Sequence, residues 1–206
     1  MKYIAFFAIL LFFTAPSGIK VTYQKMDKKT FIMNSNLPVK VKRQKMKDIN
    51  KSVSYDLEIV DNTSHFSGGE SPTIFYKDKS KGEAYMLLKQ DSKMDEPYAV
   101  KWDVDGFDWR VSANEKRKIL GYDCVKAECT EDGFEYTVWF APELKFSDGP
   151  YRFFGLNGLI LEVENKAMII TASNVELNAK VSFMMPDAFQ FVSRGFLGNR
   201  LVKSKH

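Results

Sequence analysis

The chain has 206 residues, 30 of them basic and 26 acidic, which leaves a formal net charge of +4. Charges of both signs are interspersed without a basic stripe or a recognition motif, so nucleic acid is not expected as a partner. A chain of this length suffices for one domain with a sizeable core.

Residues 1–18 have the layout of a secretory signal peptide, with a positive charge, an apolar run and a small-residue exit. The apolar run is about half the ~20 residues that a membrane-spanning helix needs, and no later segment is apolar enough. We place the cleavage after Ser17 or Gly18. The sequence therefore predicts a secreted, periplasmic or outer-membrane-associated protein without a transmembrane helix after signal removal, in which residues 19–206 form a single mostly β domain.

Alternation of apolar and polar residues recurs along the chain and predicts half-buried strands. It is strict in residues 53–59 and in residues 134–138, and a shorter run over residues 39–42 places lysines on the exposed face. The glycine-rich stretch of residues 65–72 interrupts the pattern and predicts a long loop.

Turn dipeptides join the later strands at the spacing of β-hairpins. They connect residues 98–104 to 107–112, 123–131 to 134–140, and 159–164 to 167–173, and the dipeptides are Asp105-Gly106, Asp132-Gly133 and Asn165-Lys166. Three consecutive hairpins predict an antiparallel meander. Because the chain lacks alternating helical patterns, a parallel sheet is not expected.

Only the C-terminal region has a helical pattern, beginning near Pro186 with Phe189, Val192 and Phe196 on one side. Residues 199–206 form a polar, basic tail. A single antiparallel sheet of this length must curl to bury an apolar face. We therefore predict a mainly β fold: one curved antiparallel sheet, a half-barrel or open-barrel meander, with a short C-terminal helix.

Cys124 and Cys129 lie in one predicted extended strand. Five residues at ~3.3 Å each separate their Cα atoms by ~16 Å, well beyond the ~7 Å at which a disulfide can form. They also point to opposite faces of the strand. Two free thiols are expected.

Groups that carry catalysis are scarce. The two histidines, His65 and His206, have no companions at metal-ligand or triad spacing, and the usual nucleophile, phosphate-loop and zinc motifs are missing. Neither a metal nor another cofactor is expected. Glu143 and Asp148 form a carboxylate pair that keeps a hydrolase open as an alternative.

Three segments carry a resemblance to a known family: KRKILGYDCVKAEC from Lys116, YTVWFAPEL from Tyr136, and SDGPYRFFGLNGLILEVEN from Ser147. Together they resemble the GLPGLI family of exported proteins from Bacteroidota, whose signature appears here as GLNGLI, with Asn157 in place of proline. The resemblance implies an envelope or secreted destination and an association with outer-membrane TonB-dependent uptake. It implies no established activity, cofactor or catalytic residue.

The sequence thus favours a non-enzymatic cell-envelope protein that binds an envelope protein or a lipid-like or glycan ligand. A carrier of a lipid-like molecule in a concave sheet is an alternative. The expected turn at residues 156–159 is type II, with Gly158 at positive φ. The candidate binding residues are Trp139, Asp148, Gly149, Pro150, Tyr151, Phe153, Gly155, Asn157 and Gly158.

Overall fold

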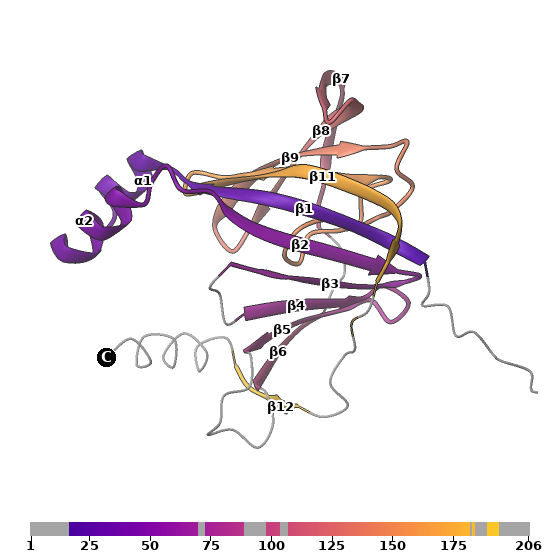
Figure 1. Ribbon diagram of the computed structural model, residues 1–206, viewed down its shortest axis with the longest axis horizontal. Helices are drawn as coiled ribbons and strands as arrows, with labels where there is room; N and C mark the ends of the chain where they lie inside the picture. The colour runs from indigo at the N-terminus through magenta and orange to yellow at the C-terminus, as the bar shows by residue number, and fades with distance from the viewer. Residues whose placement is uncertain are drawn as a thin grey trace, which may run out of the picture.

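A single open, curved sheet dominates the computed structural model, which describes residues 17–69, 73–88, 98–103, 107–181, 183 and 189–193 (Figure 1). The expected mainly β architecture is confirmed. The strands are β1 (Ser17–Asp27), β2 (Val53–Val60), β3 (Thr63–Gly68), β4 (Thr73–Asp78), β5 (Glu83–Leu88), β6 (Tyr98–Asp103), β7 (Arg110–Ile119), β8 (Tyr122–Glu131), β9 (Phe134–Ala141), β10 (Leu159–Glu164), β11 (Met168–Lys180) and β12 (Gln190–Phe191). Two helices, α1 (Lys29–Asn34) and α2 (Val39–Lys47), lie between β1 and β2.

The strand order is β12-β6-β5-β4-β3-β2-β1-β11-β10-β9-β8-β7. Strand β1 lies in the middle, between β2 and β11, so the first described strand joins the two halves of the sheet. All pairs are antiparallel except β12 with β6. Strands from the beginning and from the end of the sequence therefore lie side by side in the middle of the sheet.

Two of the three expected hairpins are confirmed. Strands β8 and β9 meet through Asp132 and Gly133, whose φ values of 51° and 73° are the left-handed pair of a type I′ turn. Strands β10 and β11 meet through Asn165, whose Oδ1 accepts the backbone N–H groups of Ala167 and Met168 at 2.8 and 3.0 Å. In the first turn the positive φ of Asp132 and Gly133 allows the chain to reverse. In the second turn the side chain of Asn165 holds the reversal through its hydrogen bonds.

The third expected hairpin is wrong. Strand β6 pairs with β5 and β12 near one edge of the sheet, whereas β7 pairs with β8 at the opposite edge. The Asp105-Gly106 signal itself lies outside the described residues. A local turn signal predicts that the chain reverses but cannot determine which strand takes the neighbouring place, because that choice depends on long-range burial.

Two assignments in the first half of the sequence are also wrong. Residues 39–42, expected as a strand, belong to helix α2. Residues 65–68 of the loop expected at residues 65–72 belong to strand β3. Pro38 precedes α2, and good helix formers follow it. An alternation of only four residues is too short to distinguish the period of a strand from that of a helix.

The expected C-terminal helix is wrong over the part that the structure describes. Gln190 and Phe191 form β12 beside β6, and the N–H of Val192 donates to the carbonyl of Ala99 at 2.9 Å. The Phe189 ring packs on Tyr85 with a centroid distance of 5.6 Å. Without β12, strand β6 would form the edge of the sheet, and its backbone groups on that side accept β12 as a neighbour. The sequence pattern of residues 189–196 gives no sign of this edge. Residues 186–188, Phe196 and the tail lie outside the described residues.

The two faces of the sheet differ in character. The inner face carries the core, in which Tyr23, Leu57, Phe66 and Val138 are almost fully buried. The outer face carries the alternate residues of the same strands, among them Gln24 and Thr171, and it is mostly polar. No helix among the described residues is long and apolar enough to cross a membrane.

Cys124 and Cys129 are both free and buried, as expected from their strand. Burial raises the pKa of each thiol to about 11. We therefore expect neither thiol to react with a thiol reagent at about pH 8 in the folded protein, because the thiolate is the reactive form. After denaturation without reductant both should be labelled, as measured by mass spectrometry. A denatured chain that takes up no label and is two hydrogens lighter would contradict the free thiols.

Candidate functional site

The segment between β9 and β10, residues 142–158, packs against the inner face of the sheet. The N–H of Leu159 donates to the carbonyl of Leu144 at 3.0 Å, and the N–H of Ile160 donates to the carbonyl of Asp148 at 2.8 Å. Leu144 and Leu156 are buried in the core. We call residues 142–158 the inner loop, and its backbone is tied to the strand that follows it.

A buried ion pair fixes the inner loop to the other half of the sheet. The Nζ of Lys77, on β4, lies 2.5 Å from Oδ1 of Asp148, and both side chains are 0% exposed. Lys79 Nζ contacts the second carboxylate oxygen, Oδ2, at 2.9 Å. Lys77 also donates to the carbonyl of Gly149 at 2.5 Å. Asp148 thus serves as the internal attachment point of the loop.

Burial by itself would raise the pKa of Asp148, but Lys77 and Lys79 outweigh it and hold that pKa below its usual value. Burial lowers the pKa of Lys77, and the nearby carboxylate offsets this only in part. A carboxyl group with a depressed pKa stabilises the fold above its unfolded pKa of about 4, and this stability is lost as the pH falls through the folded value. The pair is therefore a source of acid sensitivity.

Aromatic rings of the inner loop complete the core. The Tyr151 ring packs on Phe66 at 4.8 Å and on Phe75 at 5.5 Å between centroids. Phe153 packs on Tyr136 of β9 at 4.9 Å and is 3% exposed. These rings join β3, β4 and β9 through the loop, so they stabilise the fold and leave little aromatic surface free.

The expected type II turn at residues 156–159 is not formed. The N–H of Gly158 donates to the carbonyl of Leu156 at 2.9 Å, which closes a three-residue γ-turn around Asn157. Gly158 has a φ of 155°, far from the value near 80° that type II requires. The expected positive φ at Gly158 is confirmed. The backbone of Gly158 passes so close to the end of β9 that a Cβ there would lie 2.5 Å from the carbonyl oxygen of Ala141. This close approach determines the conformation of the turn.

The nine candidate binding residues fall into two groups. Five lie inside the protein: Asp148, Gly149, Pro150, Phe153 and Gly158. Tyr151 and Trp139 are partly exposed, and Gly155 and Asn157 are exposed. The inner loop therefore contributes mainly support.

The carboxylates of the hydrolase alternative do not form an open pair. Glu143 is exposed, and its Oε1 accepts the backbone N–H of Asp123 at 3.1 Å. Asp148 is fully buried and neutralised by lysines. A substrate reaching Glu143 from solvent would not meet Asp148, so this pairing does not support glycoside hydrolysis.

Trp139 lies on the opposite, outer face, in a polar cluster that we call the outer patch. A bulge between Ile160 and Glu162 of β10 shifts the register so that Glu162 lies beside Trp139, with Thr171 of β11 on its other side. The Thr171 hydroxyl donates to Glu162 Oε2 at 2.7 Å. The Arg117 guanidinium pairs with Glu162 and lies 4.2 Å above the centroid of the Trp139 ring.

Glu162 is only 4% exposed although it lies on the polar face, because Arg117 and Trp139 cover it. Sequence reasoning missed both Glu162 and Arg117. The available signal was the single acidic residue inside the apolar run LILEV, since a charge in a buried strand requires a partner.

A polar groove of about 620 Å³ begins next to the outer patch. Thr137 and Glu164, which line it, form the next cross-strand pair on the same face as Trp139 and Glu162. The full lining consists of Lys28, Thr130, Gly133, Glu135, Thr137, Glu164, Asn165 and Lys166. Among the described residues no cluster of three metal-binding side chains occurs.

Residues 108–193 match the family model described as "N-glycanase peptide, N-terminal domain". Two solved structures of PNGF-II, in C2 and P21 crystal forms, superpose with TM-scores of 0.65 and 0.64 at 14% identity. The chain shares its fold with part of PNGF-II. The superpositions cover 91% of this chain and 33% and 34% of the PNGF-II chains, so this chain spans about one third of their length. No curated protein sequence matches the chain.

The matched region of the family model includes the inner loop and the outer patch. It begins just before β7 and therefore contains Arg117, Trp139, Asp148 and Glu162. Lys77, the internal partner of Asp148, and helices α1 and α2 lie before it.

Proposed function

We propose that this chain is an exported, non-catalytic binding domain that holds a glycan on the outer face of its sheet, across the outer patch and the adjoining groove. The observation that carries this proposal is the polar groove of about 620 Å³ beside the partly exposed Trp139. Binding sites of this size hold small ligands, and a few placed polar groups give them specificity. The match to an N-glycanase N-terminal domain favours a glycan over other polar ligands.

The chemistry of the surface suits a sugar. Sugar rings have apolar faces that pack on aromatic rings, and hydroxyl groups that both donate and accept hydrogen bonds. Trp139, which is half-buried beside the groove with the Arg117 guanidinium over one ring face, supplies the aromatic side. Thr137 and Glu164 supply acceptors and a hydroxyl donor within the groove. Lys166 and Lys28 add donors to the groove, and Lys28 Nζ pairs with Glu164 Oε1 at 2.5 Å.

The lipid-carrier alternative receives less support. The inner face of the sheet, where a lipid-like ligand would lie, is filled by the inner loop with Leu144, Phe153 and Leu156. A lipid chain would have to displace these side chains. Export, an envelope location and an association with outer-membrane uptake rest on the leader-like residues 1–18 and on the GLPGLI resemblance, and they stay predictions.

The test is a titration of the full chain with an asparagine-linked glycopeptide and with the same peptide lacking its glycan, followed by calorimetry. We expect binding of the glycopeptide only, weakened about five- to tenfold by Trp139→Ala, since aromatic packing contributes about 0.5–1.5 kcal/mol. The matched control is Phe191→Ala, which removes an aromatic side chain that is 61% exposed at the far edge of the sheet.

Two outcomes would overturn the proposal. The first is equal affinity for the two peptides, or an affinity that Trp139→Ala leaves unchanged in a folded variant. The second is release of the glycan from the peptide during incubation, detected by mass spectrometry, which would show catalysis in place of binding.

A further inference from the structure

Helices α1 and α2 form a strongly basic projection that the proposed glycan site does not use. Residues 28–51 contain eight lysines or arginines and a single acidic residue, Asp48. Their net charge is thus +7 against +4 for the whole chain, so the remaining residues together carry −3. The positive charge of this protein is concentrated in one segment, which we call the basic hairpin (residues 28–51), so the expectation of evenly interspersed charges is wrong for this segment.

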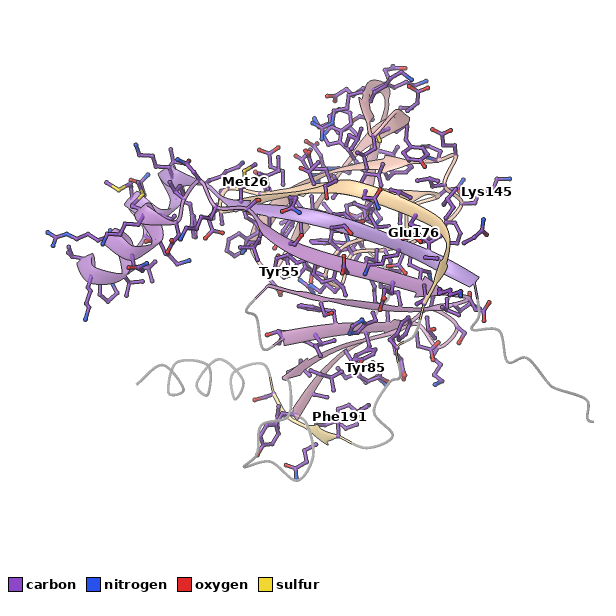
Figure 2. The ribbon with its side chains drawn as sticks, viewed as in Figure 1. Met26, Tyr55, Tyr85, Lys145, Glu176 and Phe191 are labelled. Carbon is purple, nitrogen blue, oxygen red and sulfur yellow. The ribbon has the colours of Figure 1, made fainter. Side chains whose placement is uncertain are left out.

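The basic hairpin extends beyond the end of strands β1 and β2 and away from the sheet (Figure 1). Its base is held in place: the N–H of Lys28 donates to the carbonyl of Ala167 at 2.7 Å, and Ile32 is buried. The Nζ of Lys42 donates to the carbonyl of Met33 at 3.0 Å, which joins α2 to α1. Figure 2 shows the hairpin's side chains spreading into solvent beyond Met26.

Several of its cations are available to a partner. Lys29, Lys40, Arg43 and Lys47 make no ion pair with any described residue, and all four are exposed. By contrast, Lys45 is paired with Asp27 at 3.3 Å. One of these cations lies on α1 and three lie on α2, and α2 contains no buried residue.

Exposed apolar side chains accompany these cations on the same hairpin. Met33 is 54% exposed and Val39 is 65% exposed. The exposed set on the hairpin is Phe31, Met33, Leu37, Val39 and Val41. A folded domain rarely presents so many large apolar side chains on one small projection without a partner.

We infer that the basic hairpin docks on the surface of an anionic phospholipid membrane. Basic side chains are attracted to acidic lipid headgroups, and apolar side chains of an interfacial segment insert at the boundary with the acyl chains. A nucleic acid or another polyanion would use the charges but would gain nothing from Met33 and Val39. The combination of charge and exposed apolar residues therefore favours a lipid surface.

The first arm of the experiment is co-sedimentation of the full chain with vesicles of phosphatidylcholine, with or without phosphatidylglycerol. We expect binding only to the anionic vesicles, weakening as salt is raised above about 0.1 M, where the screening length is about 10 Å. Replacing Lys29, Lys40, Arg43 and Lys47 together by glutamine should weaken binding at least about tenfold. The matched control replaces the exposed Arg110, Lys116, Lys145 and Lys180 by glutamine, which removes the same charge from other parts of the surface.

The second arm changes no charge. Met33→Gln combined with Val39→Gln should weaken vesicle binding several-fold while leaving circular dichroism and thermal unfolding unchanged, because both side chains are exposed. Binding to neutral vesicles as tight as to anionic ones, or an equal loss in the control variant, would overturn the inference. So would binding to a DNA duplex as tight as to anionic vesicles with no effect of the Met33 and Val39 replacements, which would show a polyanion site.

Discussion

Replacing Asp148 by asparagine should lower the free energy of unfolding by about 3–5 kcal/mol, because Lys77 then stays buried without a counter-charge. Both side chains are 0% exposed, so water cannot take the place of the carboxylate. The measurement is chemical denaturation followed by tryptophan fluorescence. Lys79→Gln is the matched control: Lys79 reaches solvent, and its loss leaves the inner pair intact, so we expect a change of about 1 kcal/mol or less.

Two further measurements distinguish a buried pair from simple packing. The double variant Lys77→Met with Asp148→Leu should recover most of the lost stability, since it leaves no buried charge. The stability of the parent protein should fall as the pH drops below about 4 and through the depressed pKa of Asp148, and the asparagine variant should lack this contribution. A loss below about 1 kcal/mol in Asp148→Asn would show that the carboxylate is not the attachment point of the inner loop.

Gly158→Ala should destabilise the protein by about 2–5 kcal/mol. A methyl group there would lie 2.5 Å from the carbonyl oxygen of Ala141 and 2.8 Å from the Cα of Pro142, so the backbone would have to move. Overpacking costs about 1–3 kcal/mol, and positive φ adds about 1–2 kcal/mol for a residue with a Cβ. Denaturation midpoints of the variant and the parent measure this effect.

The neighbouring Asn157 provides the opposite expectation. It is exposed, and its φ is not among the positive ones, so proline is compatible with the γ-turn observed there. Asn157→Pro should stabilise by about 0.4–1 kcal/mol through lost freedom of the unfolded chain. A destabilised proline variant, or an unaffected Gly158→Ala variant, would show that the turn is not held as described.

The inner loop and the outer patch are mechanically connected. Ile160 donates its N–H to the carbonyl of Asp148, and its own carbonyl accepts the hydroxyl of Tyr23 at 2.6 Å. Two residues later the same strand presents Glu162 on the outer face, beside Trp139. The conformation of the loop therefore sets the position of β10, which carries the carboxylate of the outer patch.

What the sequence determined by itself was local. The alternation in residues 53–59 and 134–138 established two strands, because period-two burial leaves a strong pattern. The Asp132-Gly133 and Asn165 signals located two turns, because those residues set the backbone directly. The thiols were correctly expected to be free, since strand geometry alone separates Cys124 from Cys129.

What only the tertiary structure decided was long-range. The pairing of Lys77 with Asp148 joins positions 71 residues apart in the sequence, and no spacing rule predicts it. The separation of β6 from β7, the helix at residues 39–47 and the short strand at Gln190–Phe191 depend on which edges and faces remain free once the sheet has formed. Side-chain burial and hydrogen-bond satisfaction across the whole domain select among local conformations that the sequence pattern leaves close in energy.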